Sequence, residues 1–310
     1  MTPFLVVNPA SAGGRTGRRV DALLRTIRAE LGDCHCAFTE APGHGARLAR
    51  DAAAAGSPLV VAVGGDGTAS EVADGLVAAS AAGHDAAFGY LPRGTGSDFR
   101  RTLGSDRDLA RAARELAGGE ERRVDVGRVE LAGRGGAPVA RAFVNVAGFG
   151  VSGRVDGVVE RLGKRLGGKL TYLLAGARAL VGWRDRPVRW RADGGPWREE
   201  LVTAVSVCNG RFFGGGMLVA PDAVLDDGQF DVVVWKGLGL VDLALKRPML
   251  YDGTHVRLPN TEVLRARTLE AEPTAGEPVL VDVDGDAAGV LPARFTLLPG
   301  ALRVRAPRPR

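Results

Sequence analysis

The spacing of apolar positions changes character about two fifths of the way along the chain. In the first part, short runs rich in apolar residues at 4–8, 60–63 and 88–91 predict buried strands, and a helix is expected over 109–116. The first helix has one apolar face made of Val20, Leu23, Leu24, Ile27 and Leu31. Strands that alternate with helices predict a parallel sheet with helices on its faces, and we assign residues 1–122 to this α/β domain.

Beyond about residue 123, apolar runs follow one another with Gly, Pro and Asp turns between them. The strands that this pattern predicts are 123–131, 142–147, 202–209, 229–235 and 279–284. Successive strands with short turns indicate a mostly antiparallel domain, so residues 123–291 are expected to form an all-β, sandwich-like second domain.

One segment of the second domain, 162–183, has helical spacing instead. A basic cluster marks its start, formed by Arg161, Lys164, Arg165 and Lys169. A basic amphipathic helix can lie on an anionic membrane surface. The alternative is a helix that packs on its own sheet and keeps a solvated charged end, and we favour this alternative because such helices are common.

Composition narrows the class of protein. The chain has 310 residues with 45% hydrophobic and 25% charged positions, which predicts an ordered globular protein. It has no apolar run long enough to span a membrane, no signal-peptide pattern and only 3 cysteines, so we expect a cytoplasmic setting. The net charge of +5 favours an anionic partner such as a nucleotide or a phospholipid surface. Aromatic residues are 5% and do not interleave with the basic runs, which argues against nucleic acid.

The strongest local signal is a glycine turn between a strand and a helix, at Gly64, Gly65 and Gly67. Glycines let the backbone turn sharply and approach a ligand, and free N–H groups at a helix start favour phosphate. Thr68 and Glu71 stand at capping-box spacing, which predicts the start of the helix. The turn is not a Walker A loop, because the chain contains no such motif. Taken alone, the turn could also be an ordinary strand-to-helix connection.

Three further segments have matching chemistry: the turn at 8–14, the strand and Gly/Thr/Asp loop at 88–99, and Val283–Asp286 late in the chain. With these segments in this order, the chain resembles the lipid kinases built on the diacylglycerol kinase catalytic domain, which include soluble bacterial diacylglycerol kinases and sphingosine kinases. The resemblance extends over nearly the whole chain. It implies an NAD kinase-like first domain, a β-sandwich second domain, and terminal strands over 292–310 that return to the first domain.

The resemblance also implies which residues bind ATP and magnesium. The residues that match the nucleotide site are Asn8, Pro9, Ser11, Gly13, Thr39, Gly64, Gly65, Asp66, Gly67, Thr68, Glu71 and Thr95. Asp66, Asp98 and Asp125 match a carboxylate network around the catalytic magnesium, an ion that prefers hard oxygen ligands. A second, structural magnesium would be held by the Asp227 side chain and the carbonyls of Val224 and Gln229.

Asp284 is the candidate general base, with Asp286 in support, since a lipid hydroxyl needs a positioned carboxylate to accept its proton. The alternative for Asp284–Gly285 is a plain hairpin turn. Two positions depart from the family pattern. Ser97 stands where the family usually has Asn, and Asp286 stands where it usually has Glu.

The sequence therefore predicts an ATP- and Mg²⁺-dependent lipid kinase, peripheral at the inner membrane face, that phosphorylates a hydroxyl of diacylglycerol or a similar lipid. Two alternatives stay open: a kinase of another small molecule, similar to NAD kinases, and a non-catalytic regulator that binds a nucleotide or lipid. The identity of the acceptor and a homodimer formed through a sandwich edge strand are also open.

Overall fold

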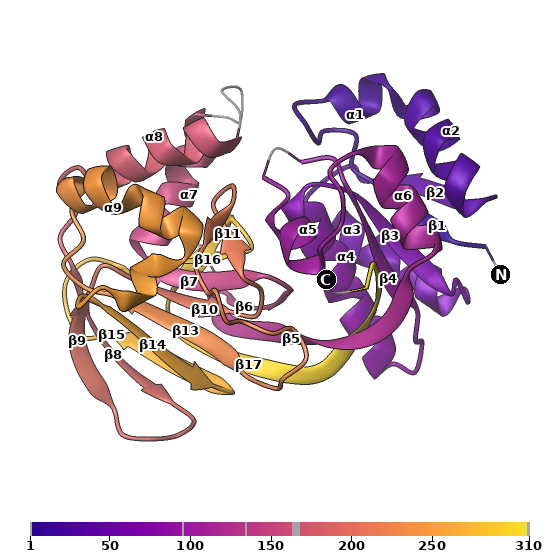
Figure 1. Ribbon diagram of the computed structural model, residues 1–310. Coiled ribbons are helices and arrows are strands. Elements are labelled where there is room, and N and C mark those ends of the chain that lie inside the picture. Colours follow the sequence, from indigo (N-terminus) through magenta and orange to yellow (C-terminus); the bar gives the residue numbers. More distant parts are fainter. Residues whose placement is uncertain (1, 95, 134, 163–167, 309–310) are drawn as a thin grey trace. The chain divides into compact units, whose positions relative to one another are not determined.

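The chain forms two compact units in its computed structural model (Figure 1). The structure describes residues 2–94, 96–133, 135–162 and 168–308. The first unit is Met1–Val126 with Pro299–Arg310, and the second is Gly127–Leu298. Two long strands, β5 (Glu120–Gly133) and β17 (Asp286–Ala306), contribute residues to both units.

A parallel sheet forms the centre of the first unit. Its shorter strands are β1 (Phe4–Val7), β2 (His35–Phe38), β3 (Leu59–Gly64) and β4 (Ala87–Pro92). The order is β17–β4–β3–β1–β2, and each neighbouring pair is parallel. All residues of β3 and β4 are buried, which explains why these strands appear as continuous apolar runs. The α/β prediction is confirmed.

Helices connect the strands of this unit. They are α1 (Arg15–Arg18), α2 (Val20–Leu31), α3 (His44–Ala54), α4 (Asp66–Ala81), α5 (Asp98–Leu103) and α6 (Leu109–Ala117). The predicted apolar face of α2 packs Leu23 and Ile27 into the same core as Leu5 of β1 and Leu116 of α6. Gly32, with φ of 72°, ends α2, a conformation that costs a glycine little.

The second unit contains two antiparallel sheets. The first has the order β14 (Thr261–Ala266), β13 (Phe230–Trp235), β10 (Ala204–Cys208), β7 (Val146–Gly150) and β16 (Leu280–Val283). The second contains β6 (Pro138–Phe143), β5, β17, β15 (Thr268–Pro273), β8 (Arg186–Ala192) and β9 (Arg198–Val202). A two-stranded pair, β11 (Phe212–Phe213) and β12 (Met217–Leu218), stands apart.

The interior of this unit is apolar. Alternate residues of the first sheet, such as Phe149, Val205 and Val232, share a buried cluster with Trp190 and Phe295 of the second sheet. The rings of Phe149 and Phe295 lie 6.2 Å apart, centroid to centroid. The predicted sandwich-like domain is confirmed.

Three helices and a short 3₁₀ turn complete the second unit as the structure describes it. They are α7 (Val151–Leu162), α8 (Gly168–Leu180), α9 (Leu240–Asp252) and η1 (Thr254–Arg257). Helix α7 packs on β7 and β16. The helix expected over 162–183 corresponds to α8, and its residues 163–167 lie outside the described residues. In the part of the chain that the structure describes, no helix has the length and apolar character needed to cross a bilayer.

Two predicted strands are each broken in the structure. The strand expected over 142–147 is divided between β6 and β7, and the strand over 202–209 is divided at Thr203 between β9 and β10. The first break has a physical cause, because the backbone N–H groups of Val144 and Asn145 donate to a carboxylate in a turn far along the chain. Local apolar pattern does not report such a partner.

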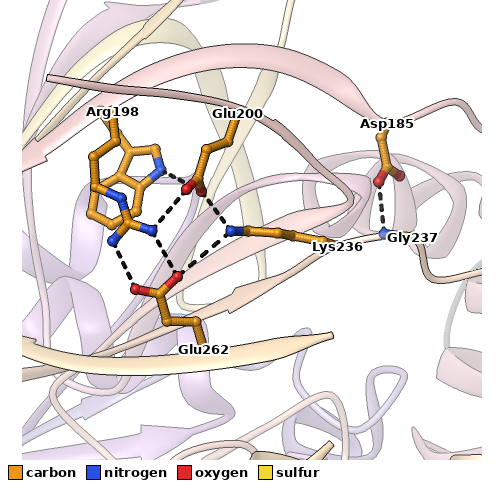
Figure 2. A network of polar contacts seen from close by, with 7 residues as sticks. Asp185, Arg198, Glu200, Lys236, Gly237 and Glu262 are labelled. Carbon is orange, nitrogen blue, oxygen red and sulfur yellow. Dashed lines mark hydrogen bonds and ion pairs between the residues drawn. The ribbon is translucent and has the colours of Figure 1, made fainter. Parts of the chain in front are cut away.

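A network of charged side chains connects the two sheets at one edge (Figure 2). Arg198 of β9 donates to both carboxylate oxygens of Glu262 of β14, at 2.7 and 2.8 Å. Glu200 of β9 accepts from Arg198 at 2.7 Å and pairs with Lys236 at 2.9 Å. The Arg198 hydrogen bonds lower the pKa of Glu262. Because these are bidentate, shared pairs, the network holds β9 against β14 more firmly than isolated surface pairs would.

Candidate functional site

The turn after β1 is fixed by its own polar side chains. Asn8 Nδ2 donates to Thr68 Oγ1 of α4 at 3.1 Å, and Asn8 Oδ1 accepts from the N–H of Ala10 at 2.9 Å. Ser11 Oγ donates to the carbonyl of Asn8 at 2.9 Å and lies 2.6 Å from Thr16 Oγ1. Two predicted nucleotide residues, Asn8 after β1 and Thr68 of α4, are therefore in direct contact.

The residues after Ser11 follow an unusual backbone path. Ala12, Gly13 and Gly14 have φ values of 54°, 67° and 78°, and Gly13 is exposed. Successive residues in this region turn their N–H groups toward one side, an arrangement that can bind anions. Pro9 lies at the start of the same turn, and its carbonyl accepts from the N–H of Gly17 at 3.0 Å.

The glycines at the ends of β3 and β4 are required by close packing. A Cβ on Gly64 would lie 2.4 Å from Thr68 Oγ1, and a Cβ on Gly94 would lie 2.7 Å from the Cα of Gly65. The N–H of Arg93 donates to the Gly64 carbonyl at 2.6 Å. The two turns therefore touch backbone to backbone, which only residues without side chains permit.

Two of the predicted metal carboxylates converge beside these turns. Asp66 is the first residue of α4, and its Oδ1 accepts from the N–H of Phe99 at 3.2 Å. A Cβ placed on Gly96 would lie 3.3 Å from Asp66 Oδ2 and 3.6 Å from Asp98 Oδ2. Two hard carboxylate oxygens thus flank a residue that has no side chain, a donor set that fits Mg²⁺.

The described residues bring two carboxylates together at this place, those of Asp66 and Asp98. Among the described residues, no three His, Cys, Asp or Glu side chains are grouped as a metal site. Magnesium commonly uses one or two carboxylates and completes its shell with water and substrate phosphates. Arg101 lies 3.5 Å from Asp98, and burial raises the pKa of the neighbouring Tyr90 phenol well above its usual value. Tyr90 therefore stays neutral beside the two carboxylates.

The predicted capping box at the start of α4 is wrong. The helix begins at Asp66 after Gly65, which offers no side chain to cap it. The Glu71 carboxylate instead accepts from the N–H groups of Gly43 and Gly45 at 2.8 and 2.9 Å, at the start of α3. Glu71 therefore caps a neighbouring helix, and the start of α4 keeps the uncapped N–H groups that favour an anion.

The remaining predicted residues of this unit lie elsewhere or outside the description. Thr39 follows β2, and its N–H donates to the Val7 carbonyl at 2.9 Å. The buried Asp125 of β5 accepts from the N–H of Gly300 at 2.7 Å. Thr95 lies outside the described residues. The proposed roles of these three residues in nucleotide or metal binding stay predictions.

In the second unit, Asp284 stands in the two-residue turn between β16 and β17. Asp284 and Gly285 have φ values of 48° and 84°, and Val283 pairs with Asp286, so the hairpin considered from the sequence is present. The Asp284 carboxylate accepts from the N–H groups of Val144, Asn145 and Val146, each at 3.0 Å. Asp284 is therefore both a turn residue and a carboxylate held in one orientation.

Asparagine side chains extend this arrangement. Asn145 Nδ2 donates to the Phe212 carbonyl, and Asn209 Nδ2 donates to the Val144 carbonyl at 2.9 Å. Asp286, more exposed, pairs with Arg141 at 3.4 Å. The predicted pair of Asp284 and Asp286 thus has one member held by backbone N–H groups and one held by a surface arginine.

At the predicted structural magnesium site, the carboxylate contacts an arginine. Asp227 forms an ion pair with Arg265, and its Oδ1 accepts from the N–H of Gln229 at 3.1 Å. Val224 is exposed. Arg265 is therefore a present partner of Asp227, and a structural magnesium held by Asp227, Val224 and Gln229 stays a prediction.

Sequence reasoning missed two buried carboxyl groups of the second unit. Asp231 of β13 and Asp282 of β16 are each 4% exposed, and burial raises the pKa of each to about 6. Their neighbours Val232, Val281 and Val283 face the sandwich core, so both aspartates face the opposite side of the sheet. Asp231 Oδ2 and Asp282 Oδ1 have no hydrogen-bond partner among the described residues. The signal was a charged residue within each apolar run.

Comparisons with known proteins agree with this division of the chain. Residues 2–129 match the diacylglycerol kinase catalytic domain, and residues 145–306 match the YegS C-terminal NAD kinase beta sandwich-like domain. A diacylglycerol kinase of Bacillus subtilis is 27% identical over 98% of this chain and 96% of its own length. A probable lipid kinase YegS-like of Pseudomonas aeruginosa is 32% identical over 98% of this chain and 94% of its own.

A solved structure of a related protein is also similar to this chain. The crystal structure of a putative diacylglycerol kinase from Bacillus anthracis has a TM-score of 0.76 and 26% identity, and it covers 99% of this chain and 97% of its own. The glycine turns, the neighbouring carboxylates of Asp66 and Asp98, and the matches to the two family models all indicate the same family. The chain therefore belongs to the lipid kinase family that combines the diacylglycerol kinase catalytic domain with the YegS C-terminal domain.

Proposed function

We propose that this protein transfers the γ-phosphoryl group of ATP, with Mg²⁺, to a hydroxyl group of a lipid such as diacylglycerol. The observation that carries the proposal is the convergence of Asp66 and Asp98 beside glycine turns that leave a helix start uncapped. This arrangement combines a cation site with a phosphate site. The relatives named as diacylglycerol kinase and probable lipid kinase supply the acceptor class.

The nucleotide would lie against the turns of the first unit. The backbone N–H groups of Ala12 and Gly13 and those at the start of α4 would donate to the triphosphate, whose negative charge the helix dipole favours. Gly64 and Gly94 allow this close approach, since a Cβ at either position would collide with its neighbours.

Asp66 and Asp98 would hold the magnesium ion. When bound, the ion would neutralise charge on the phosphate oxygens, which is the main requirement of phosphoryl transfer. The N–H of Phe99 fixes Asp66, and Arg101 lies beside Asp98, so both carboxylates are oriented before substrate arrives.

The acceptor hydroxyl must lose its proton as the new P–O bond forms. Asp284 is the proposed proton acceptor, and three backbone N–H groups hold its carboxylate in one orientation. Asp286, two residues further on, would support it from the start of β17. The cytoplasm, at the inner membrane face, is the setting proposed for this reaction.

The test is incubation of the purified protein with γ-labelled ATP, Mg²⁺ and a mixed lipid extract. The proposal predicts a labelled lipid whose mass identifies the acceptor, and loss of this product when a chelator removes the metal. Label on NAD with none on lipid would favour the NAD kinase-like alternative. ATP binding with no phosphorylated product would favour the non-catalytic regulator.

A further inference from the structure

Helix α9 presents two large apolar side chains to water. Val241 and Leu245 are 69% and 75% exposed, the two largest values among the large apolar side chains that the structure describes. Pro248 is exposed too. Spacings of four and three residues place all three on one side of the helix. A surface helix ordinarily turns such a stripe toward the core, so this stripe needs another explanation.

Helix α8 repeats the pattern. Leu174 is 44% and Val181 is 58% exposed, with the exposed Arg178 between them on the same face. The N–H of Val181 donates to the Ala177 carbonyl, so the helical path continues through it. The adjoining face, with Thr171, Ala175 and Ala179, is buried. Among the side chains of α8 that the structure describes, small residues are thus buried while Leu174 is exposed.

The two helices are neighbours. α8 contacts α9, and both lie along the same side of the second unit in Figure 1. We call Leu174, Val181, Val241 and Leu245 the α8–α9 apolar surface. Four large apolar side chains on adjoining helices form a feature that isolated exposed residues do not, and such features mark interaction sites.

The charges around this surface favour an anionic partner. Arg178 and Arg184 are exposed, and neither has an ion pair among the described residues. Lys246 and Arg247 lie on α9 next to Leu245; Lys246 pairs with Asp242, and Arg247 stacks over Tyr251. Apolar side chains combined with unpaired arginines are typical of segments that lie in the interface of an anionic bilayer.

We propose that the α8–α9 apolar surface docks this protein on an anionic lipid bilayer. The apolar side chains enter the headgroup region, and Arg178 and Arg184 contact lipid phosphates. This inference rests on the proposed function for its biological purpose, because a lipid acceptor must be reached in a membrane. Docking itself needs neither ATP nor catalysis, so the two proposals can fail separately.

The test is co-sedimentation of the full chain with vesicles of phosphatidylglycerol and phosphatidylcholine, without ATP. The double variant Val241→Ser with Leu245→Ser should bind at least tenfold more weakly, because two apolar side chains no longer enter the bilayer. Arg178→Gln should weaken binding about threefold to tenfold and reduce its dependence on salt. The matched control is Leu201→Ser on β9, since Leu201 is 60% exposed but lies outside this surface. It should bind as the unchanged protein does.

Two results would overturn the docking proposal: no binding of the unchanged protein to these vesicles, or equal binding by the double variant. If light scattering gives the double variant a lower molar mass than the unchanged protein, and vesicle binding is unaltered, two copies of the chain cover this surface instead. Phosphorylation of a short-chain, water-dispersible diacylglycerol tests the other proposal. Vesicle binding without that activity would contradict the kinase and leave docking intact.

Discussion

The carboxyl groups of the two units occupy opposite kinds of environment. In the first unit, Asp66 and Asp98 are the first residues of α4 and α5, where backbone N–H groups favour negative charge. In the second unit, Asp231 and Asp282 lie within strands, and burial raises the pKa of each to about 6. The first pair is suited to bind a cation. The second pair is suited to take up protons just below neutral pH.

In the proposed reaction, this difference would separate two roles. Phosphoryl transfer needs fixed negative ligands for a metal, and it also needs a route for the proton of the acceptor. Carboxyl groups whose environments move their pKa values apart can divide such roles between them. Asp284 stands between the two types, since it lies next to the buried strand yet accepts three N–H bonds.

The largest expected effect is on activity in the first unit. Asp66→Asn removes a negative ligand without changing size, so the rate of lipid phosphorylation should fall roughly 100- to 1,000-fold. The thermal midpoint should change little. The matched control is Asp33→Asn, an exposed turn residue, which should keep full activity. Comparable losses in both variants would show that Asp66 has no special role.

A pH-dependent effect is expected in the second unit. The pKa of Asp282 is about 6 when folded and about 3.9 when unfolded, so the folded state binds the proton more tightly. Its contribution therefore destabilises the fold progressively as pH rises from about 4 to about 6, and the full cost remains above that range. Asp282→Asn, which does not titrate, should be more stable by roughly 1 to 3 kcal/mol at pH 8 and lose this advantage near pH 4.

Urea denaturation at several pH values measures this effect. Asp51→Asn on α3 serves as control because Asp51 is exposed, and its stability should follow that of the unchanged protein at every pH. A stability advantage of Asp282→Asn that is the same at pH 4 and pH 8 would refute the titration argument.

A smaller effect is expected at Glu71. Its substitution distinguishes a structural role of this carboxylate from a role in binding the nucleotide. Glu71→Ala removes two hydrogen bonds at the start of α3 and should lower the free energy of unfolding by about 1 to 2 kcal/mol. ATP affinity should be unchanged once the variant is folded. Lost ATP affinity with unaltered stability would support the nucleotide contact that the sequence predicted.

The smallest effect is expected beside Asp98. Ser97 has φ of 51° and ψ of 52°, a left-handed conformation that Asn tolerates better. Ser97→Asn should raise stability by about 0.5 kcal/mol, whereas Ser97→Val should lower it, since β-branched residues fit this conformation poorly. Equal stability of the two variants, measured in urea, would show that backbone strain is unimportant here.

Local pattern predicted β1, β3 and β4 of the first unit but not the edge strand β2, whose residues are at most partly buried. The run at 60–63 is buried on both sides, and a buried parallel strand leaves a continuous apolar signature. The glycines at 64 and 94 were also informative, because close backbone contact tolerates no side chain. Features that depend on neighbours in the sequence could therefore be predicted from the sequence.

Features that depend on partners far along the chain could not be predicted from the sequence. The break between β6 and β7 depends on Asp284, about 140 residues further along the chain, and the role of Glu71 depends on Gly43 and Gly45. Arg265, the partner of Asp227, lies 38 residues away. The burial of Asp282 depends on the register of β16 against β7. None of these partners leaves a trace in local spacing.

The most direct test of the account is the stoichiometry of one reaction. The purified protein would be mixed with ATP, Mg²⁺ and vesicles that contain diacylglycerol, and both products would be quantified by mass spectrometry. The account predicts phosphatidate and ADP in equal amounts, and neither product above background for Asp66→Asn. ADP without phosphatidate or any other phosphorylated lipid would contradict the assignment as a lipid kinase.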